Sequence, residues 1–298
     1  MEYHNPVLLK ETVDGLNIHP DGVYVDVTFG GGGHSREIMS RLGKNGKLFA
    51  FDQDLDALKN TIDDERFTLI NENFRFIKRF LRFHGIKQVD GILADLGVSS
   101  HQFDVAERGF STRFDAELDM RMNQKGDISA YHVVNEYDEQ DIARVLFDYG
   151  ELKNARAMAN VIVTARKDKE IRNSDELKKV LAKFLPGHKS NKILAQIYQA
   201  IRIEVNQEMD VLKEFLEQSL EILKPGGRLS VISYHSLEDR LVKRFVKNGM
   251  FEGEPERDFF GNFEVPFKTI EKLIVPSEEE IAINNRARSA KLRVAEKN

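Results

Sequence analysis

The stretch Val23-Tyr-Val-Asp-Val-Thr-Phe-Gly-Gly-Gly-Gly-His-Ser35 decides the fold of this chain. Its first seven residues are rich in β-branched and aromatic side chains, which predicts a buried strand. Four glycines, Gly30 to Gly33, then form a turn, and residues 34–42 have the apolar spacing of a helix. A strand that runs through a glycine-rich turn into a helix is typical of α/β proteins that bind a nucleotide-like ligand.

Strands and helices alternate on both sides of a long helical stretch. Helical spacing at residues 56–62 and 76–83 separates the early strands. This alternation predicts a mostly parallel sheet with right-handed crossovers. The further segments with strand composition are residues 47–51, 67–70, 89–94, 228–234, 267–274 and 290–295.

The middle of the chain has a different pattern. Residues 114–208 contain several runs at helical spacing and no convincing strand. We therefore predict a discontinuous α/β domain formed by residues 1–113 and 209–298. Residues 114–208 are expected to be an all-helical insertion in that domain.

The composition excludes several classes of protein. The chain has no cysteine, so disulfides, cysteine-ligated zinc, iron–sulfur clusters and thiolate nucleophiles are ruled out. No run approaches the roughly 18 apolar residues of a membrane span, and the first residues lack the pattern of a signal peptide. We therefore expect a cytoplasmic enzyme or binding protein without membrane contact, either a monomer or a homodimer.

Basic residues are unevenly distributed along a chain whose net charge is −5. Residues 164–192 hold nine Lys and Arg against four Asp and Glu, and residues 284–298 hold five against one. Most charge runs of this kind are solvated surfaces. The alternative is that both segments contact phosphates of a nucleic acid.

Polar side chains follow the next three predicted strands. Asp52 ends the second strand, Asn71-Glu-Asn-Phe74 follows the third, and Asp95 follows the fourth. In open α/β sheets ligands bind at the carboxyl ends of the strands, so these residues and the glycine turn predict one pocket. Asp52 is placed to accept hydrogen bonds from both ribose hydroxyls of a nucleoside cofactor.

Two cofactors are compatible with such a pocket, NAD and S-adenosylmethionine (SAM). The NAD fingerprint G-x-G-x-x-G fails, because Ser35 occupies its third glycine position when counting starts at Gly30. The pattern Asp-x-Gly-x-Gly-x-Gly of SAM enzymes fits better, with Thr28 in place of its first glycine. An NAD-type oxidoreductase is the alternative, and the cofactor that raises the melting temperature distinguishes the two.

Eight motifs follow one another along the chain: HNPVLLKE at 4–11, TFGGGGHS at 28–35, DLGVSS at 95–100, ERGFS at 107–111, LDMRM at 118–122, QAIRIEVNQE at 199–208, ISYHSLEDR at 232–240 and RARSAKLR at 286–293. In these motifs and their order, the chain resembles the bacterial methyltransferases that act on cytosine N4 in small-subunit ribosomal RNA. His101, where the family usually has proline, and residues 112–117 depart from the family pattern.

The resemblance implies a class I SAM-dependent methyltransferase, with a Rossmann-like sheet and an inserted helical domain that recognises RNA. It implies SAM as the cofactor and no metal. The implied substrate is a cytidine in the decoding region of 16S rRNA, within the small ribosomal subunit. The implied cofactor contacts fall on Gly32, Gly33, His34, Asp52, Phe74, Asp95 and Gln102.

Methylation of an exocyclic amine requires that the amine be oriented and that its proton be accepted. Asp95 is the first candidate for the acceptor, because the end of the fourth strand is where the methyl group lies in this fold. Tyr234 and His235, at the end of the fifth strand, are further candidates for stacking and proton transfer, and Phe103 and Phe110 for stacking on the base.

The lack of cysteine also bears on which atom is methylated. Cytosine C5 methylation needs a cysteine thiolate that adds to the ring, so an exocyclic nitrogen is favoured here. A SAM-binding RNA chaperone without turnover is the remaining alternative, and a labelled-methyl transfer assay separates it from an enzyme.

Overall fold

The computed structural model describes residues 6–257, 259–260 and 263–298, and the chain divides into two compact units. One unit comprises Met1–Gly97 together with Met209–Asn298, and the other is Val98–Glu208. The helical insertion was predicted to start at residue 114. The second unit starts at Val98 because Val98, Phe103 and Phe110 pack in the hydrophobic cluster of the helical segment.

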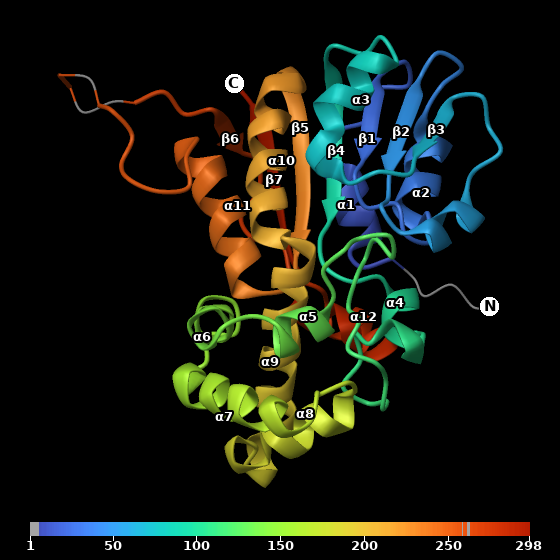
Figure 1. Ribbon diagram of the computed structural model, residues 1–298. Coiled ribbons are helices and arrows are strands. Elements are labelled where there is room, and N and C mark those ends of the chain that lie inside the picture. The colour runs from blue at the N-terminus through green and yellow to red at the C-terminus, as the bar shows by residue number, and fades with distance from the viewer. Residues whose placement is uncertain (1–5, 258, 261–262) are drawn as a thin grey trace. The chain divides into compact units, whose positions relative to one another are not determined.

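The first unit is built on a seven-stranded sheet with the strand order β3-β2-β1-β4-β5-β7-β6 (Figure 1). Strands β1 to β5 pair in parallel, whereas β7 is antiparallel to both β5 and β6. This mostly parallel sheet confirms the predicted fold class. The strands are β1 (Val23–Asp26), β2 (Lys47–Phe51), β3 (Phe67–Ile70), β4 (Val89–Asp95), β5 (Leu223–Ser233), β6 (Phe267–Thr269) and β7 (Lys291–Lys297).

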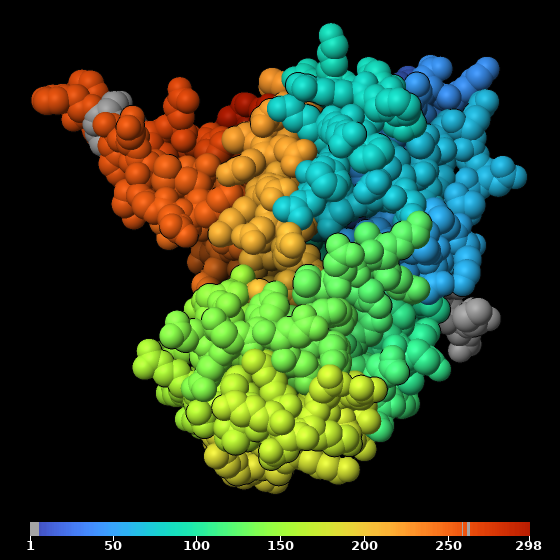
Figure 2. Space-filling view, viewed as in Figure 1, coloured from blue at the N-terminus to red at the C-terminus, as the bar shows by residue number. Residues whose placement is uncertain are grey.

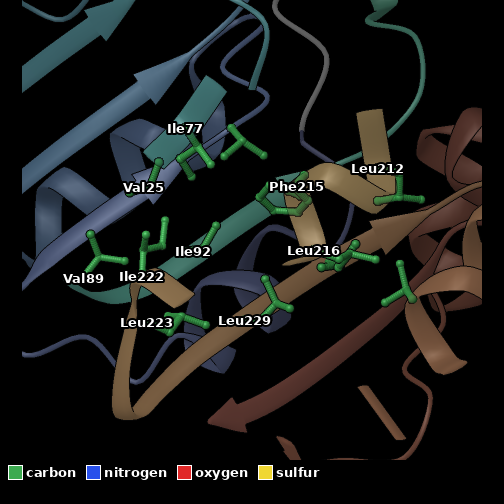
Figure 3. Packing of buried hydrophobic residues seen from close by; sticks show 14 of the residues in the cluster. Val25, Ile77, Val89, Ile92, Leu212, Phe215, Leu216, Ile222, Leu223 and Leu229 are labelled. Atoms are coloured by element: carbon green, nitrogen blue, oxygen red, sulfur yellow. The ribbon is translucent and has the colours of Figure 1, made fainter. Parts of the chain in front are cut away.

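Helices pack on both faces of this sheet because successive strand residues point to opposite sides. Tyr24 packs with α1 and α2, whereas its neighbour Val25 packs with α3, α10 and α11. Figure 3 shows the second of these cores, in which Phe215 and Leu216 lie among strand residues such as Ile92. The helices of this unit are α1 (Leu9–Gly15), α2 (Gly33–Arg41), α3 (Ile77–Phe83), α10 (Glu208–Ile222), α11 (Ser236–Asn248) and α12 (Glu278–Ile283).

Several segments of the first unit differ from the prediction. Strand β1 ends at Asp26 rather than at residue 29, and β5 begins at Leu223 rather than at residue 228. Residues 56–62 were expected to be an α-helix. They fall largely in a 3₁₀ helix, η1 (Leu55–Asn60), which the Asp54 carboxylate begins by accepting the backbone N–H of Asp56. The strand expected at 267–274 ends at Thr269, and Ile274 adds an isolated bridge to Leu292.

The second unit is helical, as its apolar spacing predicts. Its β pairing, over a range that the structure describes without a gap, is limited to the bridge between Glu117 and Asn173. In the described parts of the chain, no helix has the length and apolar character needed to cross a membrane. The helices of this unit are α4 (Ser100–Asp104), α5 (Ala130–Asn135), α6 (Glu139–Asp148), α7 (Ala155–Asp168), α8 (Ser174–Val180) and α9 (Ser190–Asn206).

Candidate active site

The order of the strands reverses at β1, because the chain continues to β2 and β3 on one side and then to β4 on the other. The carboxyl ends of the strands at such a switch point frame the crevice in which α/β proteins bind ligands. The glycine turn follows β1, Asp52 follows β2, Asp95 ends β4 and Tyr234 follows β5. The residues of this unit that were predicted to form the pocket therefore lie at the carboxyl ends of the parallel strands.

The glycine turn presents backbone rather than side chains. Gly30 and Gly32 have φ angles of 49° and 76°, in the left-handed region that favours glycine. A Cβ atom at Gly33 would lie 2.1 Å from the Pro6 side chain. The residue before α2, Gly32, supplies no side-chain cap, so the first N–H groups of α2 can bind an oxygen of a ligand.

Asp26, at the end of β1, stabilises this turn through hydrogen bonds to residues on both sides of the glycines. It is buried, and its carboxylate accepts the backbone N–H of Thr28 at 3.0 Å and the Ser35 hydroxyl at 2.7 Å. Burial raises the pKa of Asp26, while these donors oppose the rise. The carboxylate thus ties the end of β1 to the first turn of α2. We did not predict this role from the sequence, although Asp26 opens the glycine motif.

Asp52 lies against the glycine turn. Its Oδ2 accepts the backbone N–H of Gly30 at 2.8 Å, and its Oδ1 accepts that of Asp54 at 2.8 Å. Burial raises the pKa of Asp52 to about 6, against the opposing effect of these two donors. Each carboxylate oxygen can accept more than one hydrogen bond, so both keep capacity for ribose hydroxyls. Asp52 therefore connects the glycine turn to the segment that follows β2.

Asp95 is held at the end of β4 by its neighbours. Its backbone N–H donates to the Thr28 hydroxyl at 2.6 Å, and its Oδ1 accepts the Tyr234 hydroxyl at 2.7 Å. Its Oδ2 lies 3.9 Å from Nδ1 of His34, and the Asp95 side chain is 24% exposed. Burial raises the pKa of Asp95 to about 6, while His34 and the Tyr234 hydroxyl oppose the rise.

His34 is buried between Asp95 and the segment before α1. Its Nε2 lies 3.1 Å from the backbone carbonyl of Val7. A carbonyl accepts and does not donate, so this contact places a proton on Nε2 and leaves Nδ1 directed at Asp95. Of the residues predicted to contact the cofactor, His34 and Asp95 are thus brought together with Tyr234.

Tyr234 and His235 have different surroundings despite being adjacent. Burial and the charge of Asp95 raise the pKa of Tyr234 well above its usual value, so its hydroxyl stays a donor. His235 caps the start of α11, and its Nε2 lies 3.1 Å from Oε1 of Glu238. Oε2 of the same glutamate accepts the backbone N–H of Tyr234 at 2.8 Å. His235 is therefore bound into a helix cap that also positions Tyr234.

The remaining predicted residues have contacts within their own units. Phe74 packs edge-on against Phe215, with 5.3 Å between ring centroids. Gln102 is buried in the helical unit, where it forms a capping box with Ser99 at the start of α4. Phe103 is partly buried against the core of the helical unit. Phe110 is 4% exposed in that core, so the expectation that it stacks on a base is wrong.

The basic residues near the C-terminus are largely engaged in structure. Lys291 and Arg293 bind Asp239 at 3.3 and 2.8 Å. Lys297 donates to the backbone carbonyls at the junction of α10 and β5. Arg288, one of the basic residues of this segment that were predicted to contact phosphate, is exposed.

Part of the basic segment 164–192 is also engaged. Arg166 donates to backbone carbonyls of α5 and of Tyr137. Lys169, Arg172 and Lys178 form ion pairs with nearby acids. The exposed lysines of the segment that form no ion pair among the described residues are Lys167, Lys179, Lys183, Lys189 and Lys192.

The sequence matches the MraW methylase family over residues 1–298. This chain belongs to that family. The methylase is 82% identical over 297 residues to a Flavobacterium johnsoniae protein named ribosomal RNA small subunit methyltransferase H, covering 100% of this chain and 98% of that one. A protein of the same name from Bacteroides thetaiotaomicron is 57% identical over 298 residues, covering 100% and 98% of the two chains.

Family membership confirms the resemblance drawn from the eight motifs, and it removes the NAD-type oxidoreductase as an alternative. Among solved structures, an rRNA methylase from Streptococcus thermophilus aligns over 100% of the methylase and 98% of its own chain, at 14% identity and a TM-score of 0.45.

Proposed function

We propose that this chain is a SAM-dependent methyltransferase that modifies ribosomal RNA of the small subunit, and that it methylates N4 of a cytidine in the decoding region of 16S rRNA. Its family is one of methylases, and relatives at 82% and 76% identity are named for the small-subunit rRNA reaction. The observation that carries the proposal is the Asp95 carboxylate, held by Tyr234 at the switch point beside the glycine turn.

The residues around the glycine turn fit SAM. When bound, SAM supplies an electrophilic methyl group to a nucleophilic nitrogen. A Cβ at Gly32 would meet Arg36 and Phe29, and one at Gly33 would meet Pro6, so only glycine allows the turn to pack this closely, and the exposed backbone of the turn would lie against the amino-acid part of SAM. The first N–H groups of α2 bind its carboxylate, and Asp52 accepts from its ribose hydroxyls. His34, Phe74, Asp95 and Gln102 complete the proposed set of cofactor contacts.

Asp95 accepts the proton that the amine loses. A general base works best when its pKa lies near the operating pH, and an ordinary aspartate is too weakly basic for that. Burial moves Asp95 in the required direction, to a pKa of about 6. Tyr234 holds Oδ1, which leaves lone pairs of both oxygens for the amine N–H groups. Tyr234 and His235 border this position, Tyr234 by direct contact and His235 through the cap that it shares with Glu238.

Two features of the chain support N4 as the methylated atom. Attack through cytosine C5 requires a nucleophile that adds to the ring, and the sequence contains no cysteine to provide one. An exocyclic amine requires orientation and a proton acceptor, which Asp95 supplies. The cytosine leaves its stack to reach the strand ends, as bases do in other enzymes that act on them.

The helical unit and the basic residues of the tail contact the RNA in this proposal. The exposed lysines between Lys167 and Lys192 and the exposed Arg288 provide positive charge for phosphates. The lysines and arginines engaged in ion pairs or in carbonyl contacts serve the fold instead.

The test is a labelled-methyl transfer assay on small subunits and on naked 16S rRNA, followed by mass spectrometry of the nucleosides. We expect N4-methylcytidine and no protein–RNA adduct. Asp95→Asn, matched in size, is expected to bind SAM and lose turnover. Formation of 5-methylcytidine, or an adduct trapped with 5-fluorocytidine RNA, would contradict the assignment. Cofactor and RNA binding without any transfer would favour the chaperone alternative.

A further inference from the structure

Between α11 and β6 lies a segment that we call the acidic phenylalanine loop, residues 249–266, of which the structure describes 249–257, 259–260 and 263–266. It leaves α11 at Gly249, whose φ of 72° ends the helix, and returns at Pro266. Its two ends are fixed. Gly249 approaches the Pro266 ring, and Asn298 donates to the carbonyls of Val265 and Pro266 at 2.6 and 3.1 Å. The described part of the loop extends from the edge of its unit (Figures 1 and 2, orange).

The phenylalanines of the loop have different surroundings, and the Phe263 ring lies 5.0 Å from the Arg257 guanidinium. Phe251 stacks on the buried Phe245 with 4.9 Å between centroids, and it secures the base of the loop. Phe259 and Phe260 are 98% and 84% exposed, and their rings contact each other edge-on at 5.7 Å. Adjacent exposed aromatic rings of this kind are rare on a surface that has no partner, and aromatic side chains are typical anchors of protein interfaces.

The charge of the loop indicates which kind of partner these rings meet. Residues 249–266 contain five Asp and Glu against one Arg. Glu252, Glu254, Glu256 and Glu264 are all exposed. RNA phosphates would be repelled by this cluster, whereas a basic protein surface would be attracted to it. The loop is thus opposite in charge to the exposed lysines of the helical unit.

We propose that the acidic phenylalanine loop docks on a basic protein surface of the small ribosomal subunit. In this docking Phe259 and Phe260 fill an apolar recess, and the glutamates face Lys and Arg of the partner. The proposal rests on the proposed function, since it names a second contact with the same particle. RNA contacts select the nucleotide, and the loop adds a protein contact that naked rRNA cannot offer.

The test compares the binding of labelled methylase to intact small subunits and to protein-free 16S rRNA by fluorescence anisotropy. Two variants are measured. The double variant combines Phe259→Ser and Phe260→Ser, and the triple variant combines Glu252→Gln, Glu254→Gln and Glu256→Gln. Phe83→Ser is the matched control, because Phe83 is 84% exposed in the same unit but outside the loop. SAM binding by each variant reports that the fold is intact.

We expect both loop variants to weaken binding to intact subunits by roughly tenfold or more and to leave binding to protein-free rRNA unchanged. The control should behave as wild type. The glutamate variant gives the sharpest discrimination, because it tightens binding if the loop faces RNA and weakens it if the loop faces a basic protein. Tighter or unchanged binding of that variant overturns the proposal.

Methyl transfer by the wild-type protein distinguishes a failure of the docking proposal from a failure of the proposed function. If wild type methylates small subunits and the loop variants bind them as tightly as wild type does, the docking proposal is wrong and the proposed function stands. If wild type neither binds nor methylates subunits or rRNA, the proposed function is wrong and the docking proposal falls with it.

Discussion

Replacing Tyr234 by phenylalanine tests the role of Asp95 without removing either carboxylate oxygen. The Tyr234 hydroxyl donates to Oδ1 of Asp95 at 2.7 Å, and this bond favours the ionised carboxylate. A hydrogen bond to a charged group contributes about 1.5–3 kcal/mol. Asp95 is 24% exposed, so water replaces part of the loss. We therefore expect its pKa to rise by roughly one unit, since one unit corresponds to about 1.4 kcal/mol.

The sign of the effect on activity follows from the role of Asp95. A proton acceptor must be ionised, so activity is lost as the pH falls through its pKa, which is about 6 in the wild-type protein. In Tyr234→Phe the acid limb of the pH–kcat profile should move to higher pH. Well above the limb, kcat should return to within a few-fold of wild type. The KM for SAM should not change.

The measurement is labelled-methyl transfer across the pH range, with two controls. Asp95→Asn should abolish the acid limb and lower kcat by roughly 10²–10⁴-fold, the usual contribution of a general base. Tyr198→Phe removes a hydroxyl from another buried tyrosine without touching the bond between Tyr234 and Asp95. An acid limb that stays in place in Tyr234→Phe, with an Asp95→Asn protein that still turns over, would refute Asp95 as the acceptor.

Three further predictions concern the cofactor, stability and RNA. Asp52→Ala should lower SAM affinity by tens-fold, because it removes charge-assisted hydrogen bonds to the ribose and the acceptor of two backbone N–H groups. Unchanged SAM affinity by calorimetry would exclude this pocket. The raised pKa of Asp52 makes the folded protein bind more protons than the unfolded chain between about pH 4 and 6. The free energy of unfolding without cofactor should therefore fall as the pH rises through that window. In Asp52→Asn, denaturant titrations should show a smaller change of this free energy with pH. Glu substitutions at Lys179, Lys189 and Lys192 should weaken RNA binding and flatten its salt dependence, whereas Lys178→Glu, at a lysine paired with an acid, should do so less.

Much of the sheet could be predicted because each strand is marked locally, by β-rich composition and by a polar or glycine-rich end. The fate of the basic residues could not be predicted in this way. Arg293 and Lys291 belong to a basic run in the sequence, but their partner Asp239 lies more than 50 positions earlier. Pairing over such a distance depends on how β7 lies against α11. The number of basic residues in the run therefore exceeds the number left without a partner in the fold.

The positions of Asp52 and Asp95 in the fold could be predicted from the sequence, but their hydrogen-bond partners could not. Asp52 and Asp95 were marked by their positions after strands, and both lie at the expected edge of the sheet. The sequence could not show that Asp52 also accepts the N–H of Gly30, since that requires the turn to fold back on β2. It also could not show that His235 caps α11, although Glu238 stands at the spacing of a capping box.

Thr28 departs from the SAM motif and adds a hydrogen bond between two strand ends of the site. It occupies the position of the first glycine in the SAM pattern, and its side chain connects two strand ends. Its hydroxyl accepts the backbone N–H of Asp95 at 2.6 Å, while its own N–H donates to the Asp26 carboxylate at 3.0 Å. Asp26 in turn binds Ser35 in α2. The glycine turn and the Asp95 position are therefore joined through one side chain, and a glycine there would leave the Asp95 N–H without this acceptor.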